Sequence, residues 1–181
     1  MENGRTFANP APLGLAAFGV TAFLVASGEA NLFNQPFYEA FLPVALFYGG
    51  IVSILVCIME FFRGDAIGVA FFGTFGAFWL ALWYLNSHPQ ESKHLPGVFF
   101  LGFAGVAFIF WMAVMKRSMF HNLFGLLLTL TFITQTYSNW GRGHEGAIKV
   151  EGWFGILASL VALYMAAKAL INEEHGKVLL P

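Results

Sequence analysis

The chain has 181 residues, of which 58% are hydrophobic and only 10% are charged. A soluble domain carries about 25% charged residues, so this composition excludes an ordinary soluble protein and predicts a polytopic membrane protein. The formal net charge of −1 argues against nucleic acid as a partner. Apolar runs fill nearly the whole length, so we expect residues 1–181 to form a single transmembrane domain, with a polar segment at 1–10 and a polar tail at 172–181.

The first apolar run opens with the stretch Asn9-Pro10-Ala11-Pro12-Leu13-Gly14. A helix start tolerates two prolines because its first N–H groups have no partner within the helix. Asn9 is a good capping residue, so we predict a helix from about Ala11 to Ala26. Pro10, Pro12 and Gly14 then have a structural role, and Gly14 allows another backbone to come close. The alternative is that the free N–H groups of this helix start favour an anion.

Five further spans follow in chain order. The second covers 38–62 and contains Pro43 and the pair Gly49-Gly50, and the tight turn Arg63-Gly64-Asp65 ends it. Runs of about 20 residues match the bilayer thickness at about 1.5 Å rise per residue. The remaining spans are predicted at 66–85, 97–115, 119–137 and 152–171, with polar connections at 86–96, 116–118 and 140–151.

The positive residues predict the orientation of the chain. Cytoplasmic connections carry the excess of Lys and Arg, and an even number of spans puts both termini on the same side. We therefore expect an all-α protein of the plasma (inner) membrane, with six transmembrane helices and both termini in the cytoplasm. On the richer side lie Arg5, Arg63, Lys116, Arg117, Lys168 and Lys177, and on the other lie Lys93, Arg142 and Lys149.

Charged residues are rare inside the predicted spans. Only Glu60 and Lys168 fall within them, and Glu29 and Glu39 fall at their margins. A proton pump would be expected to carry a buried carboxylate relay, and a haem subunit would need an axial ligand such as an embedded His. Neither metal-ligand spacing nor a pair of nucleophile and base is evident. We therefore expect no enzyme, no catalytic residue, no metal and no cofactor.

Neutral polar residues do occur within the spans. Thr21 lies in the first, and Thr131 and Gln135 share a face of the fifth. A threonine hydroxyl often just bonds the carbonyl four residues earlier, and we weigh that alternative evenly for each threonine. An amide in hydrocarbon needs partners, so Gln135 is harder to explain structurally. Uncharged donors along a path suit a small carboxylate in transit, so the candidate substrate-binding residues are Asn9, Thr21, Thr131 and Gln135.

Several motifs of this chain occur together in order: the opening stretch with Phe18-Gly19, then Phe47-Tyr48-Gly49-Gly50, Glu60, Phe75-Gly76-Ala77-Phe78-Trp79-Leu80, Gly152-Trp153-Phe154-Gly155 and the tail 172–181. This series resembles the acetate uptake transporter family, which includes bacterial succinate–acetate permeases. The resemblance covers nearly the whole chain. It implies six helices per protomer, a homohexamer in membrane lipid and a separate path through each protomer.

The resemblance also implies a function and a set of residues. The substrates would be acetate and similar short carboxylates, sometimes succinate. An apolar constriction would be formed by Phe18, Phe75 and Leu130, with Ala162 as a selectivity position. Phe75 stands where bacterial relatives have a tyrosine, so that hydroxyl is missing here.

We therefore predict a membrane transporter or channel for acetate. The alternatives are an acetate-binding membrane sensor, since members of the same family have been discussed as signalling proteins, and a membrane enzyme or cofactor subunit. The spans hold no obvious carboxylate relay or histidine. This absence favours channel-like passage or movement of the solute as the acid.

Overall fold

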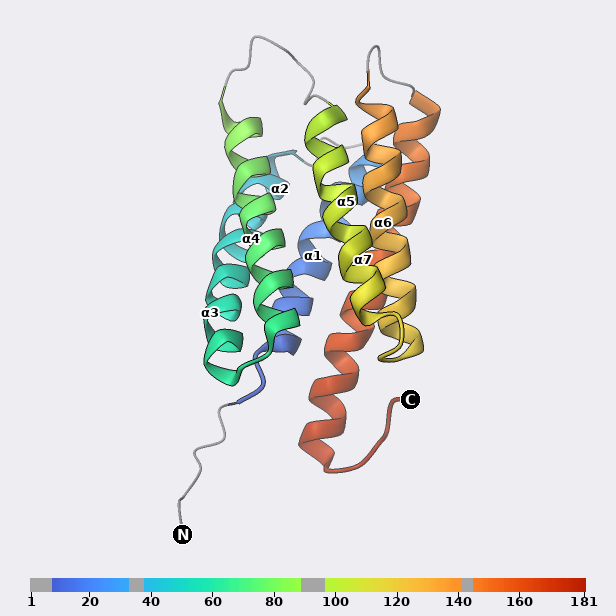
Figure 1. Cartoon of the computed structure of the whole chain (residues 1–181). Helices are drawn as coiled ribbons and strands as arrows, with labels where there is room; N and C mark the ends of the chain where they lie inside the picture. Colours follow the sequence, from blue (N-terminus) through green and yellow to red (C-terminus); the bar gives the residue numbers. More distant parts are fainter. Residues whose placement is uncertain (1–7, 33–37, 89–96, 141–144) are drawn as a thin grey trace.

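The computed structural model describes residues 8–32, 38–88, 97–140 and 145–181. All regular structure in these ranges is helical (Figure 1), which confirms the predicted all-α fold. The elements are α1 (Ala11–Glu29), α2 (Tyr38–Val44), η1 (Ala45–Val52), α3 (Ser53–Arg63), α4 (Ala66–Ser87), α5 (Gly97–Val114), α6 (Met119–Ser138) and α7 (Glu145–His175). The segments α2, η1 and α3 follow one another directly and together form the second predicted span.

Side chains cap the starts of α4 and α6, and a side chain also accepts a hydrogen bond next to the start of α1. The residue at the N-cap of α1 is Pro10, not the predicted Asn9, but Asn9 Oδ1 accepts a hydrogen bond from the Ala11 N–H at 3.1 Å and α1 begins where it was predicted. Asp65 Oδ1 accepts from the first N–H groups of α4, and Ser118 Oγ accepts from the N–H of His121 in α6. Gly64 ends α3 with φ at +75°, a conformation that suits glycine, and this confirms the predicted turn between α3 and α4.

The second span contains a π-helical segment, which the sequence reading did not predict. In η1 the helix is wider than in α2 and α3, and such segments occur often at functional sites. Two glycines allow this segment to pack closely against its neighbours. A Cβ at Gly49 would lie only 2.8 Å from Thr21 Cγ2 and from Trp79 Cγ, and one at Gly50 would overlap Leu80. The Gly49-Gly50 pair therefore brings η1 against α1 and α4.

The last helix begins earlier than predicted. Residues 140–151 were predicted to be a polar loop, but α7 starts at Glu145 and runs to His175. The prediction was wrong because the polar residues here belong to the first turns of a helix: Lys149 is exposed, whereas Glu151 is only 3% exposed and packs against protein. α1 also continues one turn beyond Ala26, to Glu29. Both extensions place carboxylates against protein.

Five of the helical segments are long and apolar enough to cross a membrane by length and composition. They are α1, the stretch Ala40–Arg63, α4, α5 and α7. The helix α6 is as long as these, with 20 residues, but its threonines and Gln135 make it more polar. It packs against α5 on one side and α7 on the other, so its polar groups face protein rather than lipid.

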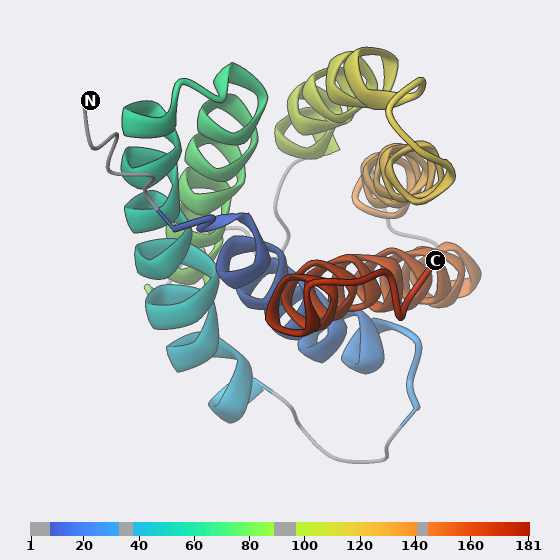
Figure 2. The same ribbon diagram turned by 90° about the horizontal axis from the view of Figure 1, so that it is seen from below.

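The helices form a ring, which is closed between α4 and α5 by contacts of side chains. Around the ring, α3 and η1 contact α4 and α1, α1 contacts α7, α7 contacts α6, and α6 contacts α5. Figure 2 shows the α3–α4 pair and the α5–α6 pair on opposite sides, with α1 and α7 between them. Helix α1 begins and helix α7 ends at the lower end of Figure 1, where the α3–α4 and α5–α6 turns also lie.

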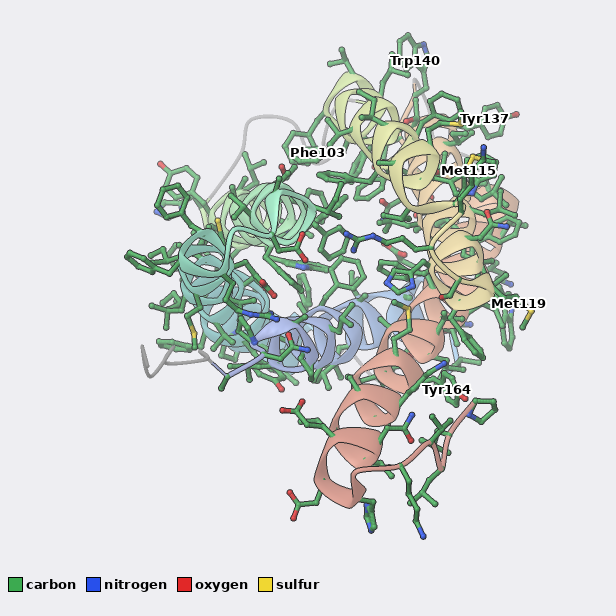
Figure 3. All side chains as sticks on the ribbon, turned by 60° about the horizontal axis from the view of Figure 1, so that its bottom comes forward. Phe103, Met115, Met119, Tyr137, Trp140 and Tyr164 are labelled. Carbon is green, nitrogen blue, oxygen red and sulfur yellow. The ribbon has the colours of Figure 1, made fainter. Side chains whose placement is uncertain are left out.

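Aromatic rings fill the interior of this helical ring. Phe18 of α1 lies 5.6 Å from Phe71 and 5.8 Å from Phe75, both on α4, and 5.5 Å from Phe124 of α6, measured between ring centroids. Between α4 and α5 the contact is also aromatic, with Phe78 4.8 Å from Phe103. Figure 3 shows that other large side chains, such as Tyr137 and Trp140 at the end of α6, project outward instead.

The close contact of α1 with α7 generates a first prediction. A Cβ at Gly152 would overlap the Ala30 backbone and lie 2.8 Å from the carbonyl oxygen of Ala26. Gly152→Ala should therefore destabilise the fold by roughly 1–3 kcal/mol, the usual cost of overpacking. Thermal unfolding in detergent micelles measures the effect.

Gly146→Ala is the matched control, because a Cβ at this exposed position of α7 would meet nothing within 4 Å. Alanine is the better helix former, so this variant should be neutral or more stable by up to about 1 kcal/mol. Equal melting temperatures for the two variants would contradict the close approach of α1 to α7.

Candidate functional site

Two cavities lie inside the helical ring, one towards each end. The lower cavity lies at the end where α1 begins (Figure 1) and has a volume of about 90 Å³. The upper cavity lies at the end where α1 finishes and has a volume of about 30 Å³. Residues from α1, α4 and α6 line both, so the two cavities follow each other along one axis of the protomer.

A group of apolar side chains, which we call the barrier, separates the two cavities. Leu128 lines both of them, Phe18 lines the upper one, and Phe71 and Phe124 line the lower one. Phe75 is 1% exposed and lies against Phe18, with ring centroids 5.8 Å apart. The barrier therefore consists of Phe18, Phe71, Phe75, Phe124 and Leu128, none of which carries a hydrogen-bond donor on its side chain.

Two of the four residues predicted to line the path lie in the barrier. Phe18 and Phe75 lie there, whereas Leu130 is half-buried and outside the lining of these two cavities. Residues two positions apart on a helix point about 200° apart, so Leu128 and Leu130 cannot share a direction. Ala162 is fully buried in the core below Ala158, which lines the upper cavity.

The sequence did contain a signal for Leu128. Leu128, Thr131 and Gln135 recur at i, i+3 and i+7, and Phe124 continues the pattern one turn earlier. Extending the face predicted from Thr131 and Gln135 backwards along the span would have identified both barrier residues of α6.

The two threonine candidates have no free donor. The Thr21 hydroxyl donates to the Ala17 carbonyl at 2.7 Å, and the Thr131 hydroxyl donates to the Leu127 carbonyl at 2.8 Å. Both threonines therefore follow the alternative given above, in which the hydroxyl bonds the backbone carbonyl four residues earlier. Their oxygens can still accept a hydrogen bond, so they can contact a ligand that brings its own donor.

Asn9 and Gln135 each have one side-chain atom hydrogen-bonded to protein. Asn9 Oδ1 accepts from the Ala11 N–H and, at 2.7 Å, from Arg63 Nη1. Gln135 Nε2 donates to Glu29 Oε1 at 3.3 Å. The amide of Gln135 thus finds the partner that the sequence could not identify.

Glu60 joins three elements at the lower end. It is fully buried, and its Oε2 lies 3.1 Å from Arg63 Nη1, which also reaches Asn9. A Cβ at Gly68 would lie 2.8 Å from Glu60 Cγ, so α4 packs directly on this side chain. These contacts tie α3 to the starts of α1 and α4.

Two side chains that can donate hydrogen bonds also line the lower cavity, and neither was predicted from the sequence as a site residue. Arg117 and His121 line it, together with Glu60 and Asp65. Arg117 Nη2 lies 3.9 Å from Asp65 Oδ1, and His121 Nδ1 lies 2.7 Å from Ser118 Oγ. An anion entering this end would meet the guanidinium before it meets the barrier.

The upper cavity has a different chemistry. Glu29, Gln135 and Thr131 line it, and so does Trp79 at the level of the barrier. Trp79 is 3% exposed, and its Nε1 has no hydrogen-bond partner in the described part of the chain. Glu29 Oε2 is likewise buried and without a partner.

A second carboxylate lies next to this cavity. Glu151 of α7 is buried, and its Oε2 accepts a hydrogen bond from the Ser138 hydroxyl. The expectation that the interior lacks a buried carboxylate was therefore wrong. It failed because α1 and α7 are longer than predicted, so Glu29 and Glu151 fall inside the protein rather than in loops.

Among the described residues, no group of three or more His, Cys, Asp or Glu side chains is placed to hold a metal ion. The site chemistry of these ranges thus consists of two cavities, an apolar barrier and a few polar side chains at either end.

The contacts of Glu60 generate a second prediction. Arg63→Gln leaves the buried Glu60 without its cation and removes the bond to Asn9. The free energy of unfolding should fall by about 1–3 kcal/mol, less than for a fully buried pair because Arg63 is partly exposed.

Arg117→Gln serves as the matched control, since it removes the same charge from an exposed ion pair and should change stability by about 0.5 kcal/mol or less. Thermal unfolding in micelles compares the two variants. A larger loss in Arg117→Gln than in Arg63→Gln would argue against a structural role for the Glu60 contacts.

Comparisons with known proteins cover the whole chain. A model of the GPR1/FUN34/yaaH family matches residues 2–181. The chain is 31% identical over 184 residues to the succinate-acetate/proton symporter SatP of Escherichia coli K12, with 96% of this chain and 94% of that protein covered. It is 29% identical over 185 residues to the ammonia transport outward protein 2 of Saccharomyces cerevisiae, covering 96% of this chain and 65% of that one.

A solved structure is also similar. The structure of the bacterial acetate channel SatP matches with a TM-score of 0.89 at 27% sequence identity, covering 97% of this chain and 99% of that one. The ring of helices described above is thus a known fold.

Proposed function

The chain belongs to the GPR1/FUN34/yaaH family, and from this membership we propose that it passes acetate and similar short carboxylates across the membrane. It is an all-helical, multi-pass membrane protein with five helical segments long and apolar enough to cross a membrane, and we propose that α6 crosses beside them as the sixth. The observation that carries the proposal is the pair of cavities that meet at the barrier within one protomer. Similarity along the whole chain to a succinate-acetate symporter and to an acetate channel supports it.

The geometry suggests how a short acid would pass. At the lower end, Arg117 and His121 can attract and orient a carboxylate. At the barrier, the methyl group of acetate can lie against Phe18 and Leu128, but the carboxylate must leave its water, which is the costly step. A neck lined by rings and one leucine discriminates by size and by the cost of dehydration.

The relatives with transport names point away from an enzyme, and we propose no reaction chemistry for this chain. Substrate recognition in this proposal needs neither a cofactor nor a metal ion. It needs donors at the two ends and a short apolar segment between them.

We further propose that both termini lie in the cytoplasm of the plasma membrane and that the protomer assembles as a homohexamer. The start of α1 and the end of α7 lie at the same end of the bundle (Figure 1), as an even number of spans requires. Support for assembly comes from α5, where Leu101 and Ile109 are exposed and a Cβ at Gly102 or Gly105 would meet nothing within 4 Å. Small residues on an open apolar face allow close helix packing in lipid.

Counterflow tests the proposed function directly. Proteoliposomes loaded with unlabelled acetate and diluted into labelled acetate, at equal pH on both sides, should transiently accumulate label, because a path through the protomer exchanges the two pools. Liposomes without protein provide the background of acetic acid that crosses lipid unaided. A membrane sensor would bind acetate without accelerating exchange, so exchange no faster than in protein-free liposomes would reject transport.

The position of Leu128 generates a prediction about selectivity. Leu128→Ala should widen the neck and raise the flux of a larger acid such as lactate by roughly tenfold or more relative to acetate, the scale of discrimination by a few methyl groups. Leu130→Ala removes the same atoms from a different face of α6 and should leave the ratio of lactate flux to acetate flux near that of the unmodified protein.

Uptake of labelled lactate and of labelled acetate into proteoliposomes measures the flux ratio for both variants. If Leu130→Ala admits lactate and Leu128→Ala does not, the constriction lies at Leu130, as the family resemblance implied.

A further inference from the structure

Helix α4 meets α5 and α6 through side chains rather than through close approach of backbones. The backbone of α4 packs along η1 and α3, but it has no extensive contact with the backbone of α5 or α6 in the described part of the chain. Figure 2 shows the α3–α4 pair and the α5–α6 pair standing apart. The helical ring is therefore divided at this place into two sides.

Aromatic rings fill the boundary between the two sides, which we call the seam. On α4 it consists of Phe71, Phe75 and Phe78, and on α5 of Phe103 and Phe110. The ring centroids of Phe78 and Phe103 are 4.8 Å apart, and Phe110 lies 5.7 Å from Phe71 and 5.9 Å from Phe75. Lipid tails are as apolar as these rings, so no hydrophobic driving force holds such a contact together in a membrane.

An ion pair joins the two sides at the lower end of the seam. Arg117, in the turn between α5 and α6, lies 3.9 Å from Asp65 at the start of α4. Both side chains are partly exposed, and exposed ion pairs contribute little to stability. The seam is therefore held by contacts of rings and by one weak polar bridge.

Each side of the seam is packed tightly within itself. A Cβ at Gly73 of α4 would lie 3.0 Å from Cys57 Sγ of α3, so these two helices lie close together. A Cβ at Gly125 of α6 would lie 2.9 Å from Trp111 Cα of α5, and Trp111 Nε1 donates to Asn122 Oδ1 at 2.7 Å. Closely packed helices move together, so each side behaves as one unit.

The barrier is divided between the two units. Phe71 and Phe75 lie on α4, Phe124 and Leu128 lie on α6, and Phe18 lies on α1 between them. Buried rings fill the space between the two cavities, so a solute crosses only if barrier side chains separate. A shift of α4 away from α6 separates them without disturbing the packing within either unit.

Resting on the proposed function, we propose that the barrier opens by separation of α4 from α5 and α6 along the seam. The segments α2, η1, α3 and α4 move as one unit, and the close contact of α1 with α7 at Gly152 serves as the hinge. The rings of the seam slide apart, and the bridge between Arg117 and Asp65 opposes this motion at the lower end. The structure described above is the closed state.

Cross-linking across the seam tests the proposal in the counterflow assay. The pair Phe78→Cys and Phe103→Cys, in a Cys57→Ser background, is joined by a short bis-methanethiosulfonate reagent. Linking should lower the protein-dependent acetate exchange roughly tenfold or more, because it holds the protein in the closed state, and a reductant should restore exchange. The linker is slimmer than the two rings that it replaces, so it does not itself fill the path.

A second pair repeats the test without removing a core ring. Asp65→Cys and Arg117→Cys, in the same background, lie at partly exposed positions on the two sides of the seam. Exchange is compared in the same protein before and after linking, so the lost charges affect both measurements equally. Linking should again lower exchange, and size exclusion confirms that each variant is folded.

Gly73→Cys with the native Cys57 is the matched control. A Cβ at Gly73 would lie 3.9 Å from Cys57 Cβ, within the range of about 3.5–4.5 Å found in disulfides. Oxidation therefore links α4 to α3 inside one unit, and acetate exchange should stay at the level of the reduced protein. Treatment of Phe103→Cys alone, in the Cys57→Ser background, with the bis-methanethiosulfonate reagent should also leave its exchange unchanged.

The outcomes separate this inference from the proposed function. If both seam pairs, shown by mass spectrometry to be linked, exchange acetate as fast as before linking, the inference is overturned, while counterflow by the unmodified protein still supports transport. If the disulfide between positions 57 and 73 stops exchange as strongly as the seam links do, α4 does not move together with α3 and the proposed hinge is wrong. Exchange by the unmodified protein at the protein-free rate would overturn both proposals.

Discussion

The close approach of α1 to α7 is the steric constraint on which the rest of the structure depends. Gly152 and Gly155 have no side chain, and the backbone of α7 therefore lies directly against Ala26 and Ala30. This contact holds α1 between η1 and α7 in the helical ring, so that the Phe18 side chain reaches the aromatic rings of α4 and α6. The same contact sets the outer end of α1 against α6 and α7. The close contact between α1 and α7 thus positions Phe18 in the barrier and also positions the carboxylates Glu29 and Glu151.

Hydrogen bonding in this interior leaves few donors for a ligand. In hydrocarbon every polar group seeks a partner within the protein, and the threonines of α1 and α6 satisfy this by bonding their own backbone. The amide of Gln135 goes to Glu29. Among the described residues, Trp79 Nε1 and Ser27 Oγ are buried donors without a partner, and of these two residues only Trp79 lines the upper cavity.

Much of the fold could be predicted from the sequence, because spans and turns follow from local chemistry. Apolar runs of bilayer length, Asp65 as a cap and Gly64 at a positive φ are local signals, and they gave the helices and the turn between α3 and α4. The π-helical segment, the early start of α7 and the burial of Glu29 and Glu151 depend on packing between helices, which no local pattern reports. For Leu128, the helical face shared with Thr131 and Gln135 could be predicted from the sequence, but the family resemblance indicated Leu130 instead.

The two ends of the path differ in a way that bears on how an acid would cross. The lower cavity presents Arg117 and His121 beside Glu60 and Asp65, whereas the upper cavity presents Glu29 with Glu151 behind it. A cationic group at the lower end attracts a carboxylate, whereas the carboxylates at the upper end repel one. The barrier between them offers no hydrogen-bond donor on its side chains, so a carboxylate loses its water there without compensation. The two ends therefore bind a carboxylate unequally, and the barrier is the costly step between them.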